Sequence, residues 1–442
     1  MAAYRKLFST TAIILGCLLL GLSSVSAQGT MPGMAAMENS VGFLSAGTSI
    51  EPKTTSESAP MIHKPLGSWT LMFHGNAFLA DVQQKGPRGS DKLFSVNWLM
   101  PMVSHDFGRQ TVTFRTMFSL EPATVTGRRY PELFQSGETA YGFPIVDGQH
   151  PHNFFMEMAM RYDLRLTGSA RVFIYGGPVG DPALGPTAYA HRASASENPV
   201  AALGHHQEDS THIANSVITV GAGTGPIQLE ASTFRGRESG ENRWKLVTGK
   251  PDSFSSRLTF AIGNKFTGQF SAGRINHREA LEPGLATFRT TASVHHNFRF
   301  SGGHVASSFI WGRNKDLAGH GARIFNSYTA ESTVNFGNRN WVWTRIENLD
   351  RARTLLTGET PAALEVGEDR IGRVQAYTFG YERDLPIGPS FLNLGLGFQA
   401  TTYGLPPVLR TTYSDHPAAF IFFLHVRPKG NLAAHMQMMH QH

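Results

Sequence analysis

The chain has 442 residues, a formal net charge of +6 and 46 glycines, and only 16% of its residues are charged. The lack of arginine-rich blocks and stacked-aromatic motifs argues against a nucleic-acid partner. The one cysteine, Cys17, lies in an N-terminal apolar run, so the rest of the chain has neither disulfides nor thiolate metal sites. No later stretch is apolar for long enough to form a membrane-spanning helix.

Residues 1–27 have the pattern of a signal peptide. Arg5 and Lys6 precede an apolar run over residues 12–22, and the small residues Ser-Val-Ser-Ala end the pattern. We therefore expect an exported protein whose signal peptide is cleaved. A lipoprotein anchored through Cys17 is the alternative.

Three further parts are expected after the signal peptide. Residues 28–67 contain several methionines among glycine, proline and serine, and we expect them to be flexible. Residues 68–428 carry regular hydrophobic patterning and are expected to fold as a β-barrel, for the reasons given below. Residues 429–442 form a tail rich in methionine and histidine.

Residues 154–166 show the periodicity on which the fold prediction depends. Side chains in a β-strand point alternately to opposite faces. The apolar set is Phe154, Met156, Met158, Met160, Tyr162, Leu164 and Leu166, and the opposite set is Phe155, Glu157, Ala159, Arg161, Asp163 and Arg165. The three methionines are therefore expected on an apolar face and not in a copper site.

About sixteen such runs follow one another along the chain, each about as long as a tilted strand that crosses a bilayer, which needs about 9–11 residues. They lie near residues 69–82, 92–105, 108–121, 153–166, 169–178, 212–222, 226–236, 253–263, 266–277, 285–299, 303–314, 323–336, 340–351, 370–384, 390–402 and 418–427. Short turns that contain turn-forming residues alternate with longer loops, and two loops are very long, near 122–152 and 179–211.

An even number of strands with short turns at one end and long loops at the other is typical of bacterial outer-membrane barrels. Over residues 68–428 the chain resembles bacterial outer-membrane porin-like β-barrels through this periodic pattern. The resemblance implies an all-β, up-and-down antiparallel transmembrane β-barrel of about 16 strands in outer-membrane lipid, with short periplasmic turns and long extracellular loops. A secreted soluble sandwich or propeller is the alternative fold, and the sequence leaves open whether the barrel is a homo-oligomer.

A barrel of this size is wide enough for a channel. The side chains expected to line its lumen are Arg115, Glu157, Arg161, Asp163, Arg165, Glu230, Arg257, Arg289, Arg299 and Glu331. Arginines outnumber carboxylates in this set, which favours anions in an open pore. Salt bridges between neighbouring strands would cancel that preference. The 122–152 loop, with Arg128, Arg129 and Tyr130, is the expected constriction.

The two very long loops and their ends concentrate histidines. These candidate metal ligands are His150, His152, His191, His205, His206 and His212. The intervening proline keeps the backbone between His150 and His152 extended, so both imidazoles can converge on one ion if the loop bends. Neutral imidazole binds copper, nickel or zinc. A metal site is one hypothesis, and solvated or hydrogen-bonded structural histidines are the other.

The C-terminal tail supplies a second set of candidate ligands. They are His435, Met436, Met438, Met439, His440 and His442. Thioether sulfur favours Cu(I), and imidazole accepts Cu(I) or Cu(II). Methionine- and histidine-rich arms on a barrel look like those of copper-resistance outer-membrane proteins. This resemblance implies copper as the metal and a periplasmic metal-handling protein as the partner, whereas chance composition of a short tail is the alternative.

We expect a channel and not an enzyme. Asp209, Ser210 and His212 place acid, nucleophile and base types together, but adjacent strand residues cannot all face one site. The Gly-x-Ser-x-Gly nucleophile elbow is also missing. A plugged structural or metal-binding barrel and a membrane-embedded hydrolase stay as alternatives to the channel.

Overall fold

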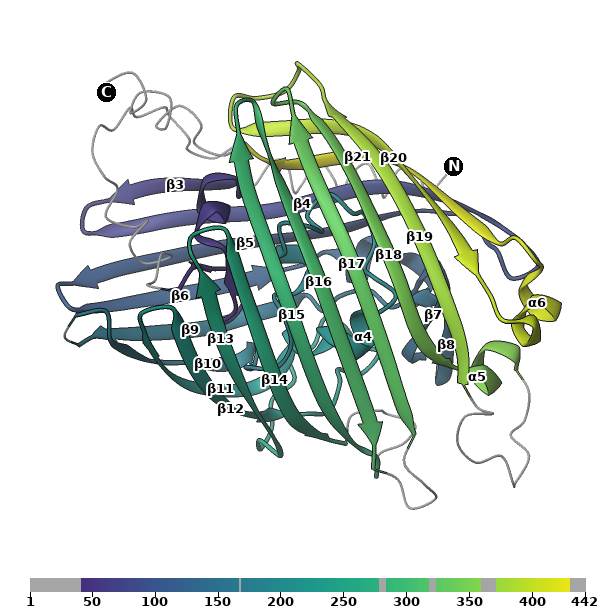
Figure 1. Ribbon diagram of the computed structural model, residues 1–442, viewed down its shortest axis with the longest axis horizontal. Coiled ribbons are helices and arrows are strands. Elements are labelled where there is room, and N and C mark those ends of the chain that lie inside the picture. Colours follow the sequence, from purple (N-terminus) through teal and green to yellow (C-terminus); the bar gives the residue numbers. More distant parts are fainter. Residues whose placement is uncertain (1–40, 167, 278–283, 318–322, 359–370, 430–442) are drawn as a thin grey trace.

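Sixteen antiparallel strands of the described residues pair with their neighbours and close into a barrel (Figure 1). The computed structural model describes residues 41–166, 168–277, 284–317, 323–358 and 371–429. The last strand, β21, closes the barrel against the first long strand, β4, with Ala418 opposite Lys85 and Val426 opposite Ala77. The fold prediction is therefore confirmed: the chain forms an up-and-down transmembrane β-barrel.

The barrel strands coincide with the sixteen runs that the alternation predicts. They are β4 (Trp69–Lys85), β5 (Lys92–Phe107), β6 (Gln110–Phe118), β9 (Phe155–Arg165), β10 (Arg171–Gly180), β11 (Ala214–Thr224), β12 (Ile227–Arg235), β13 (Ser253–Ile262), β14 (Phe266–Asn276), β15 (Ala286–Phe300), β16 (Gly303–Asp316), β17 (Ile324–Phe336), β18 (Asn340–Ala352), β19 (Ile371–Asp384), β20 (Leu392–Gly404) and β21 (Ala418–Pro428).

The outer face of the barrel is apolar and the inner face is mainly polar. In β12, Leu229 is 59% exposed on the outside, whereas the inward neighbours Gln228 and Glu230 are buried. In β14, Phe270 lies outward and Ser271 inward in the same way. An outward row of large apolar side chains around a closed barrel is stable in lipid, where backbone groups must also be paired. Among the described residues, no helix has the length and apolar character needed to cross a membrane.

Connections at one end of the barrel are tight turns, and those at the other end are longer. Gly225 and Gly263 have φ values of +52° and +60°, which glycine adopts without the strain of a Cβ atom, and each closes a short turn. This end is called the short-turn end, and the opposite end is called the long-loop end. The short helices α5 (Arg353–Thr357) and α6 (Pro407–Tyr413) lie at the long-loop end.

Three parts of the chain fold into the barrel lumen. The N-terminal segment, residues 41–60, contains β1 (Phe43–Leu44), β2 (Ile50–Glu51) and η1 (Lys53–Glu57). The hairpin connection, residues 119–154, contains α3 (Glu121–Thr124), η2 (Thr126–Arg128), β7 (Tyr130–Ala140) and β8 (Phe143–Gln149). The interior segment, residues 181–213, contains η3 (Tyr189–His191), α4 (His205–Glu208) and η4 (Ser210–His212). Figure 1 shows α4 enclosed by the barrel strands.

The N-terminal part is more ordered than the sequence predicts. We expected residues 28–67 to be flexible, but residues 41–60 are largely buried and β3 (Met61–Leu66) pairs with the start of β4. The physical reason is that Val41, Phe43 and Leu44 pack against apolar side chains on the inner wall. Residues 1–40, which include the expected signal peptide and the beginning of the flexible segment, lie outside the described residues.

The methionines of β9 do not share one face. We expected Met156, Met158 and Met160 on the lipid side, but Met156 is 1% exposed and packs in the interior. Phe155 pairs with Phe118 and Glu157 pairs with Met117, so Met156 is an extra residue in a β-bulge. The alternation is broken at this residue, and Met160 still lies outward.

Candidate functional site

The interior segment runs along the inner wall and is held there by polar contacts. Near its start, the backbone N–H of Ala183 donates to Ser232 Oγ over 2.8 Å. In its middle, Thr333 Oγ1 donates to the carbonyl of Ser194 over 2.8 Å. Because these wall residues belong to β12 and β17, the segment crosses the lumen and does not follow one strand.

Arg192 is the charged centre of the interior segment. Its Nε lies 2.6 Å from Oε1 of Glu331, and its Nη1 lies 3.0 Å from Asp209. Arg345 of the wall approaches the other oxygen of Glu331 at 3.0 Å. Burial alone would lower the pKa of Arg192, but Glu331 and Asp209 raise it above the usual range. The guanidinium is therefore a permanent charge whose partners are buried with it.

The N-terminal segment closes the lumen toward the short-turn end. Arg257 Nη2 donates to Thr48 Oγ1 over 2.8 Å, and the N–H of Thr54 donates to the carbonyl of Asn264 over 3.2 Å. Asn264 lies in the short turn between β13 and β14, which places the segment at that end. Burial raises the pKa of Glu51 in this segment to about 7.

The side chains predicted to line the lumen mostly point into the barrel. Seven are buried: Arg115, Glu157, Arg161, Glu230, Arg257, Arg289 and Glu331. Asp163 and Arg299 are partly buried, and Arg165 is exposed at the short-turn end of its strand. The inward direction follows from the alternation, but the lumen that they face is occupied by the three interior parts of the chain.

Most of these charges neutralise one another. Arg115 pairs with Glu157 at 2.7 Å, Arg161 with Asp163 at 2.7 Å and Arg257 with Glu230 at 2.9 Å. The first and third pairs join neighbouring strands, as the alternative interpretation expects, whereas Arg161 and Asp163 lie on the same strand. In these three pairs each arginine is neutralised by a carboxylate, so none of the three adds a free positive charge that would favour anions.

The loop expected to form the constriction, residues 122–152, enters the lumen only in part. Arg128 and Arg129 are exposed, and Arg128 pairs with Glu241. Tyr130 is buried, with its ring stacked 4.7 Å from that of Phe94 on β5. The interior segment is also buried in the lumen, against the inner wall.

Five of the six loop histidines come together in one cluster. The ring centroids of His205 and His212 are 5.1 Å apart, and those of His152 and His212 are 5.9 Å apart. His206 lies 5.3 Å from His205 and 5.6 Å from His150. The hairpin connection supplies His150 and His152, and the interior segment supplies the other three.

His191 lies apart from this histidine cluster. Its Nε2 is 3.3 Å from the sulfur of Met117, and its ring centroid is 5.7 Å from that of His74. Burial lowers the pKa of His191 well below its ordinary value, so the ring is neutral. The surrounding cavity of about 40 Å³ is also lined by Met61 of β3, by Met100 of β5 and by residues of the N-terminal segment.

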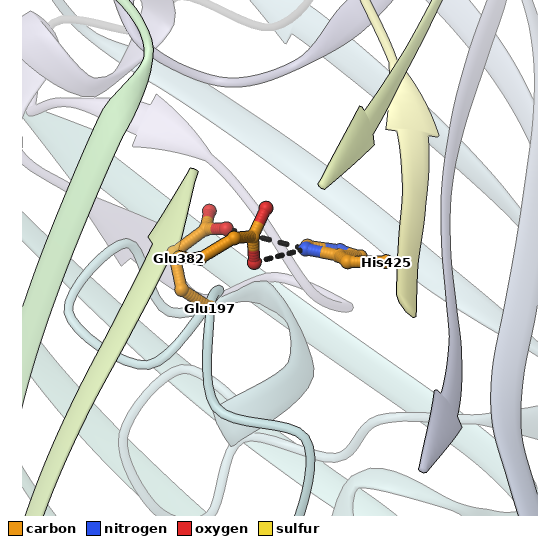
Figure 2. A group of neighbouring side chains, drawn as sticks. All are labelled: Glu197, Glu382 and His425. Carbon is orange, nitrogen blue, oxygen red and sulfur yellow. Dashed lines mark hydrogen bonds and ion pairs between the residues drawn. The ribbon is translucent and has the colours of Figure 1, made fainter. Parts of the chain in front are cut away.

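A buried cluster that the sequence analysis missed lies at the short-turn end (Figure 2). Glu197 and Glu382 both face the ring of His425, at 3.4 Å and 2.8 Å from its Nδ1. One ligand atom from each of these three side chains lies within 4.8 Å of the other two, which is close enough for the group to hold a metal ion. Arg427 pairs with both carboxylates, which makes the cluster an ion-pair network.

For the part of this cluster that lies on β21, the alternating sequence pattern predicts side chains that point inward. His425 and Arg427 occupy the inward positions of β21, opposite the lipid-facing Phe422 and Leu424. Glu197 belongs to the interior segment, however, and no periodicity relates it to a strand. Only the three-dimensional path of the interior segment brings it there.

The residues proposed for a hydrolase are not arranged for nucleophilic catalysis. Ser210 Oγ lies 3.1 Å from Arg289 Nη1 and 3.5 Å from the carbonyl of His206. His212 Nδ1 bonds instead to the carbonyl of Asp209 over 2.8 Å. The geometry therefore offers no serine–histidine hydrogen bond at this position.

The tail ligands lie outside the described residues. These are His435, Met436, Met438, Met439, His440 and His442. Their role as metal ligands stays a prediction, as does the resemblance to copper-resistance proteins.

No protein-family model matches the sequence, and no curated protein sequence matches it. Similar solved structures include Salmonella typhi OmpF in complex with daunomycin, at 8% identity and a TM-score of 0.48, covering 82% of this chain and 100% of that one. The loop L8 deletion mutant of OmpT, an outer membrane protein of Vibrio cholerae, has 8% identity and a TM-score of 0.47, and the match covers 82% of this chain and 99% of that one. Pseudomonas aeruginosa OpdQ has 9% identity and a TM-score of 0.38, and the match covers 80% of this chain and 99% of that one. The barrel assignment rests on the chain's own closed strand order.

Proposed function

We propose that the protein is an outer-membrane channel whose lumen is held closed by its own chain. The observation that carries this proposal is the burial of the interior segment against the inner wall, from Ala183 beside β12 to Gln207 beside β18. In an open diffusion pore this volume would be filled with water. The short turns are assigned to the periplasm and the long loops to the cell exterior, as in bacterial barrels of this kind.

The contacts of the interior segment favour a movable closure over a permanent one. Many of its bonds to the wall are neutral hydrogen bonds, such as that of Ser194 with Thr333 and that of Gln207 with Asp350. Water can replace a polar contact when the segment leaves, so each bond costs only about 0.5–1.5 kcal/mol net. An apolar interface of the same area would lose much more on exposure to water.

The topology also permits withdrawal without disruption of the barrel. The interior segment begins after Gly180 of β10 and ends before Ala214 of β11. These two strands are neighbours, with Gly180 opposite Ala214. Both ends of the segment therefore emerge at the same rim, and the segment can move outward through the long-loop end.

Planar-bilayer recording tests the proposal. The wild-type chain is expected to show infrequent single-channel steps, and Arg192→Met to show more frequent ones because the buried ion pairs of the segment are lost. Arg410→Ala is the matched control, since Arg410 is half exposed and its ion pair with the exposed Asp415 is long, at 3.9 Å. Heat-modifiable migration verifies that each of the three proteins is folded. Absence of single-channel steps in all three would favour the plugged structural alternative.

A second candidate function is the handling of a soft cation such as Cu(I). One observation favours it: Met61, Met72, Met100, Met102, Met117 and Met156 are all buried in one interior cluster beside His191. Thioether and imidazole are the ligand types that Cu(I) prefers. In a Cu(I) titration of the full chain, Met102→Leu is expected to lower the Cu(I) affinity. Met160→Leu, on the lipid face, serves as the control. Equal affinities for the two variants would remove this candidate.

A further inference from the structure

Three imidazoles from two separate interior parts of the chain pack around the ring of Tyr189. His152 comes from the hairpin connection, and His205 and His212 come from the interior segment. The ring of Tyr189 contacts all three, with its centroid 5.1 Å from that of His205, 6.0 Å from that of His152 and 6.2 Å from that of His212. His205 and His212 are neighbours within the interior segment, whereas His152 belongs to another part of the chain and is brought to them only by the closed lumen.

Hydrogen bonds fix the same nitrogen of each ring as the donor. His152 Nδ1 lies 2.8 Å from Oε1 of Glu121, and His205 Nδ1 lies 2.6 Å from Oδ1 of Asp209. His212 Nδ1 lies 2.8 Å from the carbonyl of Asp209. Carboxylate and carbonyl oxygens only accept, so each Nδ1 carries the proton in the neutral ring and each Nε2 carries the lone pair. At His152 this lone pair faces the hydroxyl of Tyr189, 3.2 Å away, which an ion would replace.

These outer bonds are those of metal-binding histidines. A ligating imidazole almost always donates its second N–H to a carboxylate or a backbone carbonyl, which fixes the ring and increases its basicity. His212 provides a further sign, because its Nε2 is buried and has no hydrogen-bond partner. A buried polar atom without a partner costs free energy unless something binds it.

We propose that His152, His205 and His212 bind one borderline divalent cation of the Zn²⁺ and Cu²⁺ class through their Nε2 atoms. Three imidazoles on one tetrahedral ion, with each nitrogen about 2 Å from it, have ring centroids roughly 5 Å apart. Two of the three pairs have spacings near this value, with 5.1 Å between His205 and His212 and 5.9 Å between His152 and His212. Among the described residues, the ligand nitrogens of this trio do not all lie within 4.8 Å of one another, so binding requires the hairpin connection and the interior segment to approach each other.

The donor set selects the class of ion. An all-imidazole site suits Zn²⁺ and Cu²⁺, whereas Ca²⁺ and Mg²⁺ prefer oxygen ligands and Cu(I) prefers sulfur. The cluster of Glu197, Glu382 and His425 has its ligand atoms closer together, but Arg427 already occupies its carboxylates. A second cation there would face the guanidinium, so the histidine trio is the better metal site.

Binding at this site would join the two interior parts that enter from the long-loop end. The ion would tie His152 of the hairpin connection to His205 and His212 of the interior segment. Outward movement of the interior segment would then require loss of a ligand. This regulatory effect rests on the proposed channel function, whereas the metal site itself does not.

Absorption spectroscopy with Co²⁺ tests the site in the full chain folded in detergent. Tetrahedral nitrogen coordination gives Co²⁺ a much stronger visible band than aqueous Co²⁺ has, and Zn²⁺ should displace it. The wild type is expected to take up a single equivalent of tetrahedral Co²⁺. His212→Ala and His205→Ala should lose the band, and His416→Ala, which changes an exposed histidine, should keep it.

A variant outside the ligand set guards against loss through misfolding. Glu121→Gln keeps an oxygen acceptor near His152 but removes the charge, and it should weaken Co²⁺ affinity by roughly 10–100-fold. Heat-modifiable migration verifies that each barrel is folded. A wild type without the tetrahedral band, or a band that survives His212→Ala in folded protein, would overturn the proposal. Neither readout depends on conductance, so failure of the channel proposal would be seen separately.

Discussion

Arg192 of the interior segment and Glu331 of β17 form a fully buried ion pair, with 2.6 Å between Nε and Oε1. The same carboxylate accepts Ser194 Oγ at 2.9 Å, so one wall residue holds two points of the segment. Removal of one partner from a buried pair leaves the other charge desolvated and uncompensated. The interior segment is therefore tied to the wall at a point where substitution has a large effect.

Glu331→Gln is expected to lower the free energy of unfolding by about 3 kcal/mol, because Arg192 then loses its closest charged partner and keeps Asp209 at 3.0 Å. The interior segment should also become more sensitive to limited proteolysis. Denaturant titration in detergent measures the first effect and mass spectrometry of the fragments measures the second. Asp415→Asn, at an exposed pair, should change neither. Equal stability of Glu331→Gln and the wild type would show that the pair does not hold the segment.

The N-terminal segment should be held more tightly in acid than in base. Burial raises the pKa of Glu51 from 4.5 to about 7, so the folded state binds this proton more strongly than the unfolded state does. The stabilisation is fully present below pH 4.5 and is lost progressively as the pH rises to about 7.

Glu51→Gln removes this titration and provides the comparison. Between pH 5 and pH 8 the wild type should lose about 2 kcal/mol more unfolding free energy than the variant. Denaturant titrations at the two pH values give both numbers. Parallel pH profiles of the two proteins would refute a buried, proton-binding Glu51.

The lipid face should reject charge according to depth. Phe270 lies outward in the middle of β14, whereas Ile262 lies outward at the end of β13. Phe270→Arg is expected to cost about 2–4 kcal/mol of folding free energy in lipid vesicles, and Ile262→Arg about 0–1 kcal/mol. Folding titrations in urea measure both. Equal costs at the two positions would argue against a bilayer around this face.

The sequence predicts the barrel wall well because a strand repeats every two residues. In β12, the alternation of Leu229 with Gln228 and Glu230 separates lipid from lumen without any other information. Met156 escapes the rule because a bulge adds one residue to β9, and nothing in the local sequence marks that insertion.

The contents of the lumen were harder to predict. The interior segment has no regular period, and its contacts join residues more than a hundred positions apart, as between Arg192 and Glu331. The histidines were recognised by residue type, and their density in two long loops was the only available signal. Which of them converge depends on the path of both loops inside the barrel, and Glu197 could not be placed for the same reason.

A reversible lock on the interior segment tests the central claim of a movable closure most directly. Ser194 of the segment and Ser308 of β16 have Oγ atoms 2.7 Å apart, so Ser194→Cys with Ser308→Cys should form a disulfide between segment and wall. In planar bilayers we predict single-channel steps from the reduced protein and none from the oxidised protein. Equal conductance in the two states, with the disulfide verified, would contradict the account.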